Sequence, residues 1–302
     1  MQKALLLMNG SAGRAQVSQE TYRIIEKMAL AGYRVTVCPV EPSRGLRSEE
    51  VIVEEGEKFD LITCAGGDGT LNHVINAMMK IPQEKRPRMG YIPAGSTNDF
   101  ARSLEIPTEV GDAVDVITGG APFRYDLGKF NDRYFNYIAA FGAFSAVSYS
   151  TSQNFKNAFG HAAYILRALT TFQKNVHYSC HMQITTEDFE EESDYVFGAI
   201  YNTMSVGGFQ LKDNVQTELD DGYFEMLLVK APRNVLILNQ IALKLLNGDL
   251  NDPHVTFHKV KHAKIVPDKE TGWALDGEYG GSPSEINFEV CPRAIELMVP
   301  DK

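Results

Sequence analysis

Short apolar runs alternate with segments of helical periodicity along the first third of the chain. After residue 70, apolar side chains recur at the spacing of a single helical face, which predicts a helix packed against a sheet. Alternation of strand and helix predicts an open, mainly parallel sheet with helices on both faces. The helical face consists of Leu71, Val74, Ile75, Met78 and Met79; further helices are expected within 17–31 and 51–56, and strands at 3–8, 34–40, 60–65 and 89–94.

From about Tyr125 the pattern changes to strand-like runs, interrupted by two helical segments at 158–172 and 235–247. This change predicts two domains: a doubly wound, Rossmann-like three-layer α/β domain over 1–124, and a mostly β domain, a β-sandwich, over 125–302. The strands expected in the second domain are 134–142, 178–185, 195–202, 223–230, 254–266, 273–275, 286–290 and 295–299.

Composition narrows the class of protein. The 302 residues are 44% hydrophobic and 23% charged, as in ordinary globular proteins, and the formal net charge is -10. An acidic surface argues against a general nucleic-acid binder, which needs basic side chains for phosphate. The four cysteines show no paired spacing, and no apolar run approaches the roughly 18 residues of a membrane span, so we expect a cytoplasmic protein with free thiols.

Three turns rich in small residues follow three of the predicted strands. They read NGSAG at 9–13, GGDGT at 66–70 and PAGSTNDFAR at 93–102. Because the strands are predicted to be parallel, all three turns lie at the carboxyl edge of the sheet, where open α/β sheets bind ligands. Together they predict a nucleotide site at that edge.

The turn GGDGT has the composition of a phosphate cradle. Glycines permit positive φ and close approach of backbone amides to an anion, and the following helix points its positive end at the same place. Asp68 would repel phosphate, so its expected partner is a divalent metal, the water around that metal, or a hydroxyl group. The alternative is an ordinary glycine turn in which Asp68 and Thr70 serve as helix caps.

The order of these motifs resembles the catalytic domain of diacylglycerol kinases and of their bacterial lipid-kinase relatives, a family that includes sphingosine and ceramide kinases. The resemblance continues with FGHAAY at 159–164, LDDGYF at 219–224 and LDGE at 275–278, and so covers nearly the whole chain. It implies transfer of the γ-phosphoryl group of ATP, with Mg²⁺, to the hydroxyl of diacylglycerol or a related lipid alcohol at the cleft between the domains.

The resemblance also implies which residues would hold the nucleotide. Asp68 would belong to a water-mediated network around magnesium, and Ser96 would supply a hydroxyl group where the family commonly has threonine. The proline that the family often has in its first turn is replaced by Gly10, and no nucleotide contact is assigned after the second strand. The residues expected at ATP are Asn9, Ser11, Gly66, Gly67, Asp68, Gly69, Thr70, Leu71, Asn72 and Ser96.

Two acidic turns in the second domain are the remaining candidates. By resemblance, a structural magnesium would bind the Asp221 carboxylate and the backbone carbonyls of Glu218 and Tyr223, although an ordinary Asp-Gly hairpin has the same composition. Glu278 is the expected general base and Asp276 is its rival. In an extended run both carboxylates would face the same way, but Gly277 permits a sharp turn that would separate them.

Alternatives remain open at this point. The GGDGT turn and the two-domain layout also resemble soluble NAD kinases, and a noncatalytic nucleotide- or lipid-binding protein would carry the same motifs. The segment 93–104 and the LDGE motif favour the lipid branch. A lipid acceptor implies peripheral contact with the inner membrane face. The oligomeric state stays open, a homodimer included, and the aromatic side chains between 155 and 172 fit either an acyl groove or a core.

Overall fold

The computed structural model describes residues 1–10, 16–41, 44–95, 98–142, 179–203, 205–206, 209–210, 218–246 and 249–301. The chain forms two compact units. The first comprises Met1–Asp126 together with Pro292–Lys302, and the second comprises Leu127–Cys291. Each unit is described by itself.

A parallel sheet forms the middle layer of the first unit. Its strands β1 (Gln2–Met8), β2 (Tyr33–Pro39), β3 (Leu61–Gly66) and β4 (Arg88–Pro93) lie in the order β4-β3-β1-β2. Both β3 and the last five residues of β1 are buried along their whole length. A strand covered on both faces needs apolar side chains at every position, which explains their continuous apolar runs.

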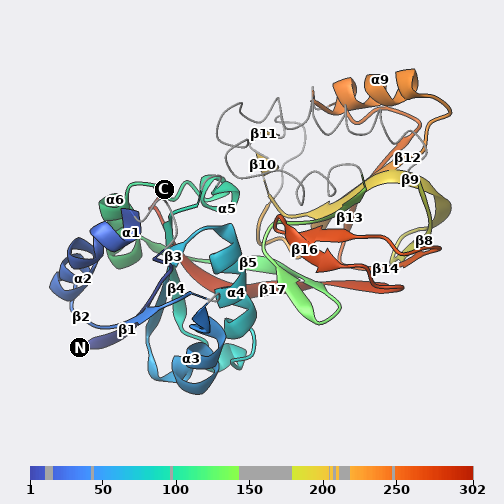
Figure 1. The fold of residues 1–302 in the computed structure, drawn as a ribbon. Coiled ribbons are helices and arrows are strands. Elements are labelled where there is room, and N and C mark those ends of the chain that lie inside the picture. Colours follow the sequence, from blue (N-terminus) through green and yellow to red (C-terminus); the bar gives the residue numbers. More distant parts are fainter. Residues whose placement is uncertain are drawn as a thin grey trace. The chain divides into compact units, whose positions relative to one another are not determined.

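Helices cover both faces of this sheet (Figure 1). Alternate side chains of β1 enter a core with α2 (Thr21–Leu30) and α6 (Val110–Gly119), and Leu6 packs there with Ile24 and Val114. The other face carries α3 (Ser48–Glu55) and α4 (Asp68–Met78). The predicted three-layer α/β fold is confirmed. The shorter elements are α1 (Gln16–Gln19), α5 (Asp99–Ser103) and the 3-10 turns Gly56–Lys58 and Gln83–Lys85.

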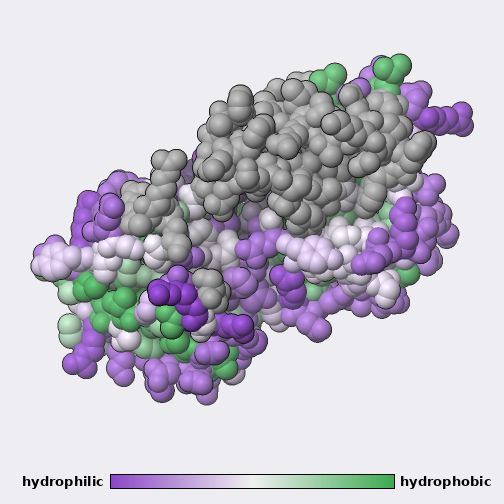
Figure 2. All heavy atoms as spheres, in the orientation of Figure 1, coloured by the Kyte–Doolittle hydropathy of each residue, from purple (hydrophilic) through white to green (hydrophobic). Residues whose placement is uncertain are grey.

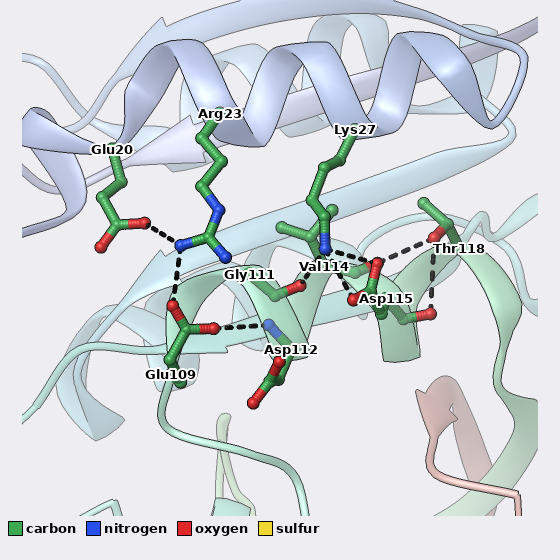
Figure 3. A network of polar contacts seen from close by, with 9 residues as sticks. All are labelled: Glu20, Arg23, Lys27, Glu109, Gly111, Asp112, Val114, Asp115 and Thr118. Atoms are coloured by element: carbon green, nitrogen blue, oxygen red, sulfur yellow. Dashed lines mark hydrogen bonds and ion pairs between the residues drawn. The ribbon is translucent and has the colours of Figure 1, made fainter.

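Polar side chains join α2 to α6 above their shared core (Figure 3). The guanidinium of Arg23 bonds to Glu20 at 3.0 Å and to Glu109 at 2.8 Å, while Lys27 Nζ lies 2.6 Å from the Asp115 carboxylate. All of these groups are at least partly exposed to solvent, and such ion pairs contribute little to stability. The apolar core shared by α2 and α6 is therefore the main source of stability between them.

The end of the chain returns to the first unit. The sequence interpretation had placed residues 125–302 wholly in the second domain. The strand β17 (Ile286–Val299) pairs in parallel with β4, Leu297 opposite Met89. The Arg293 amide donates to Asp126 Oδ1 at 2.7 Å, and Arg86 donates to the Ala294 carbonyl. Residues 292–302 therefore complete the sheet of the first unit.

The second unit is mostly antiparallel β-structure, so the predicted fold class, α/β followed by a β-sandwich, is confirmed. Its strands face a common apolar core, in which the Trp273 ring packs against the rings of Phe141 and Phe130. The strands are β5 (Ala121–Phe130), β6 (Arg133–Phe135), β7 (Ile138–Gly142), β8 (Cys180–Thr186), β9 (Glu190–Tyr201), β12 (Phe224–Lys230), β13 (Val255–Val260), β14 (His262–Pro267), β15 (Trp273–Leu275), β16 (Glu278–Gly281) and β17, with a short hairpin of β10 (Ser205–Val206) and β11 (Phe209–Gln210) (Figure 1).

Several details differ from the predicted elements: the run expected as one strand at 134–142 is divided into β6 and β7, and α6 and β5 were not predicted. The run expected as one strand at 254–266 is divided at Lys261 into β13 and β14, and the two strands expected at 286–290 and 295–299 form the single strand β17. The helix α9 (Val235–Leu246) confirms the second predicted helix, and its Leu238 and Ile241 pack on the sheet. The helix expected at 158–172 lies outside the described residues.

Candidate functional site

The first two turns of the predicted nucleotide site are joined by hydrogen bonds. The Asn9 amide donates to the Ala65 carbonyl at 2.9 Å, and the Asn9 side chain donates to Thr70 Oγ1 at 2.9 Å. The third turn joins the second, because the Ala94 amide donates to the Gly66 carbonyl at 2.8 Å. Residues from the carboxyl ends of β1, β3 and β4 therefore meet around the start of α4.

The glycines of this site serve close packing. Glycine permits both positive φ and close approach, and here none of Gly66, Gly67 and Gly69 has positive φ; Gly67 has φ -86 and ψ -179. A Cβ atom on Gly66 would lie 2.7 Å from the Thr70 Cβ, and one on Gly95 would lie 2.9 Å from the Gly67 Cα. The second and third turns thus touch backbone to backbone, which only residues without side chains allow.

Asp68 links the second turn to the third. It is the first residue of α4, and its Oδ2 accepts a hydrogen bond from the Asn98 amide at 3.1 Å. Asn98 in turn closes its own loop on Gly95, accepting from the Gly95 amide at 2.8 Å and donating to the Gly95 carbonyl at 3.0 Å. The backbone of Asn98 is left-handed, with φ 51, a conformation that asparagine tolerates better than most residues.

The amino end of α4 has the geometry of an anion site. The first amides of any α-helix have no acceptor within the helix, and here the first intrahelical bond runs from the Leu71 amide to the Gly67 carbonyl. The amides before it add to the positive end of the helix dipole. The side chains of Leu71 and Asn72 are buried, and the Leu71 amide already donates within the helix. Ser11 and Ser96 lie outside the described residues.

Asp276 and Glu278 are separated by a tight hairpin between β15 and β16. Leu275 pairs with Glu278, and the two residues between them, Asp276 and Gly277, have φ 49 and 86. Positive φ at both positions is typical of the type I′ turn that Asp-Gly favours. Gly277 therefore sends the two carboxylates in different directions, and Glu278 is exposed at the start of β16 whereas Asp276 is only 4% exposed.

The buried Asp276 carboxylate holds the segment before β7. Its Oδ2 accepts from the Asn136 amide at 2.7 Å and from the Asn136 side chain at 3.0 Å. Its Oδ1 accepts from the amides of Tyr137 and Ile138 at 3.0 and 3.2 Å. A buried carboxylate that accepts four hydrogen bonds stabilises the local structure. Of the two candidates for the base, Glu278 alone is exposed to solvent.

The Asp221 carboxylate is engaged within its own turn. Its Oδ1 accepts from the Tyr223 amide at 2.9 Å, and its Oδ2 forms an ion pair with Lys259 Nζ at 2.6 Å. Lys259 also lies 4.0 Å from the buried Glu225. The hydrogen bond to Asp221 is the main cause that raises the pKa of Lys259, and the charges of Asp221, Glu225 and Glu218 add to it.

These residues fit a hard cation. The carboxylates of Asp221 and Glu225 lie 2.6 and 4.0 Å from the Lys259 ammonium group, so two carboxylates share this positive charge at the turn. Carboxylate and carbonyl oxygens are the ligands that magnesium prefers. Among the residues that the structure describes, no cluster of three His, Cys, Asp or Glu side chains has metal-binding geometry, so a cation here would depend on backbone oxygens and would compete with Lys259.

Comparison with known proteins identifies the family. Residues 3–130 match the family model of the diacylglycerol kinase catalytic domain. The chain is 31% identical over 301 residues to a diacylglycerol kinase of Staphylococcus carnosus (strain TM300), covering 99% of this chain and 95% of that one. It is 32% identical over 302 residues to a diacylglycerol kinase of Staphylococcus aureus (strain MRSA252), covering 99% and 93%. The chain belongs to the diacylglycerol kinase family.

Solved structures agree with this assignment. A crystal structure from Bacillus anthracis str. Sterne aligns with a TM-score of 0.80 and 25% identity over 99% of this chain and 95% of that chain. A diacylglycerol kinase from the same organism aligns with a TM-score of 0.77 and 24% identity over 99% and 97%. The match to the family model and the two staphylococcal relatives make the chain a lipid kinase of this family, which favours the lipid branch over the NAD kinase-like alternative. In the described part of the chain, no helix has the length and apolarity to cross a membrane.

Sequence interpretation missed several residues that hold the candidate side chains in place. Asn98 joins the second and third turns, Asn136 fixes Asp276, and Lys259 neutralises Asp221. The only local signal was the Asn-Asp pair at 98 and 99 inside the third turn. The other two contacts join residues far apart in sequence, which periodicity and motif spacing do not reveal.

Proposed function

We propose that this member of the diacylglycerol kinase family transfers the γ-phosphoryl group of ATP, with magnesium, to the hydroxyl of diacylglycerol or a related lipid alcohol. One observation carries the proposal: three hydrogen-bonded turns converge on the amino end of α4 in a chain whose relatives are diacylglycerol kinases. Such a site offers amides and a helix dipole to phosphate, which is what phosphoryl transfer requires of the protein.

The first unit would hold the nucleotide. The amides of Asp68, Gly69 and Thr70 would bind phosphate oxygens, since the glycines keep side chains away from the cradle. Asp68 would hold water bound to magnesium, and the Asn98 amide keeps one oxygen of its carboxylate in place. Magnesium, when bound, would neutralise charge on the transferred group.

Glu278 would act as general base. As the lipid hydroxyl oxygen attacks the γ-phosphorus, its proton passes to the Glu278 carboxylate, the bond from the γ-phosphorus to the bridging oxygen breaks, and ADP leaves. Glu278 is exposed and begins a strand, so its side chain is accessible while its backbone is held. Asp276 would keep its four hydrogen bonds throughout and so maintain the hairpin that carries Glu278.

A structural magnesium would sit at the Asp221 turn. The Asp221 carboxylate and the carbonyls of Glu218 and Tyr223 would hold it, with Lys259 sharing or leaving the carboxylate. Gly222, with φ 79, shapes the loop that turns these carbonyls. This ion would organise the turn, and phosphoryl transfer would use the magnesium near Asp68.

The lipid substrate implies a cytoplasmic enzyme that meets the inner face of the membrane. Two leucines on the outer side of α9, Leu236 and Leu243, are 73% and 58% exposed. Apolar atoms project from the surface there (Figure 2). Residues 226–248 contain no Asp or Glu, although the chain as a whole is acidic. These side chains are suited to contact with an anionic bilayer.

The direct test is a phosphorylation assay. Purified protein would be incubated with labelled ATP, magnesium and a panel of lipid alcohols in mixed micelles, beside NAD as a soluble acceptor. We expect label on a lipid alcohol, and label on NAD alone would overturn the lipid assignment. Glu278→Gln should abolish transfer while nucleotide binding stays, and Glu289→Gln, an exposed glutamate on β17, is the matched control that should keep full turnover.

A further inference from the structure

A buried hydroxyl group lies beneath the nucleotide turns. Tyr91, in the middle of β4, is 0% exposed, and its hydroxyl group has no hydrogen-bond partner among the residues that the structure describes. Tyr91 pairs with Cys64 of β3. Its neighbour Gly90 faces Ile117 of α6, so Tyr91, next along the strand, points to the opposite face, which α3 and α4 cover.

The Asp68 carboxylate belongs to the helix that covers the same face of the sheet as this hydroxyl. Asp68 follows Cys64 by four residues and begins the helix that covers this face of the sheet. Burial is the main cause that raises the pKa of Tyr91 well above its usual range, and the negative charge of Asp68 raises it further. The same two causes raise the pKa of Cys64. The negative charge of Asp68 therefore disfavours ionisation of both Tyr91 and Cys64.

Packing alone does not require this hydroxyl group. A buried hydroxyl without a partner costs stability, because it gives up its bonds to water and gains none in return. Phenylalanine would fill nearly the same space without that cost. The hydroxyl is therefore explained best by a bond that forms in another state of the protein.

We propose that Tyr91 is a positioning residue for Asp68. When nucleotide and magnesium engage Asp68, the Tyr91 hydroxyl donates a hydrogen bond to its carboxylate, directly or through one buried water, while the Asn98 amide holds Oδ2. The carboxylate is then fixed from the core as well as from the third turn. Tyr91 touches neither substrate nor metal, and the proposal rests on the assignment of Asp68 to the magnesium network.

Tyr91→Phe tests this role, with Thr63→Val as the matched control. Thr63 also carries a buried hydroxyl without a partner among the described residues, but it pairs with Gly90 and faces α6, away from Asp68. Neither change should lower the unfolding midpoint. Tyr91→Phe should weaken binding of a non-hydrolysable ATP analogue in the presence of magnesium by about tenfold to a hundredfold, the usual worth of a hydrogen bond to a charged group. Thr63→Val should bind as the wild type.

A double-mutant cycle with Asp68→Ala separates positioning from a general effect on the fold. If Tyr91 acts through Asp68, adding Tyr91→Phe to Asp68→Ala should change binding no further. Wild-type binding by Tyr91→Phe, or an equal loss in the Asp68→Ala background, would overturn the proposal. Because binding is measured by calorimetry without lipid, failure to phosphorylate any lipid would count against the proposed function and leave this test intact.

Discussion

Asp276→Asn should destabilise the second unit, whereas Glu278→Gln should leave its stability unchanged. The two carboxylates are separated by one residue, yet one is buried under four hydrogen bonds and the other is exposed. Asparagine keeps the shape of aspartate and tolerates the left-handed backbone found at this position, φ 49, so only the hydrogen bonding changes.

The magnitude follows from the number of donors that lose an acceptor. Asparagine offers one carbonyl oxygen in place of two carboxylate oxygens, so two of the four donors would face an amide group that cannot accept. Each buried donor left unsatisfied costs about 1–3 kcal/mol, so we expect a loss of about 2–6 kcal/mol. That is a large share of the roughly 5–15 kcal/mol that holds a domain together.

The chain contains a reporter for this measurement. Trp273 is its single tryptophan, is fully buried, and lies in β15 just before Asp276. Its fluorescence during unfolding in urea should show a lower midpoint for Asp276→Asn at an unchanged slope, and the wild-type midpoint for Glu278→Gln.

Two results would refute the reasoning. A wild-type midpoint for Asp276→Asn would mean that the four bonds contribute little to the stability of the second unit. A folded Asp276→Asn protein without turnover, together with an active Glu278→Gln protein, would make Asp276 the base. The same preparations therefore decide both the structural and the catalytic assignment.

Three further predictions concern the turns. Gly95→Ala should abolish nucleotide binding in calorimetry, because the new Cβ would lie 2.9 Å from the backbone of the second turn. Gly119→Ala is the control and should bind normally, because its new Cβ would have no atom within 4 Å. Equal binding by the two variants would refute the packing argument. Lys259→Gln should raise the affinity of the Asp221 turn for magnesium in a titration, and unchanged affinity would argue against a cation there. The pKa of Asp252 is lowered to about 2, mainly because the His254 amide donates a hydrogen bond to its carboxylate. The ionised carboxylate therefore stabilises the fold fully above the usual aspartate pKa of about 4, and this contribution is lost as pH falls towards 2. Asp252→Asn should make stability less dependent on pH over that range, and an unaltered acid-unfolding profile would contradict this.

Local pattern was enough to predict the layers of the fold. Apolar side chains at helical spacing predicted α4, and continuous apolar runs predicted the buried strands β1 and β3, because a helix or strand shows in its own sequence which of its faces are covered. The Asp-Gly pair at 276 and 277 likewise carries the chemistry of its turn, since both positions require positive φ.

Tertiary structure decided the tasks of individual polar groups. Asp276 and Asn136 are 140 residues apart, and only the folded sheet brings the buried carboxylate to its donors. Residues 292–302 join the first unit because β17 pairs with β4, a contact that no local pattern encodes. The glycines of GGDGT were correctly noticed in the sequence, but the reason for them is the close contact of Gly67 with Gly95.

The sequence by itself thus determined most of the elements, the change from α/β to β structure, and a set of turns suited to phosphate, because these depend on neighbours within a few residues. The tertiary structure decided which carboxylate is buried and which is exposed, and that Asn98 joins Asp68 to the third turn. Those outcomes depend on donors that come from distant strands, and a hydrogen bond exists only where the fold brings both partners together.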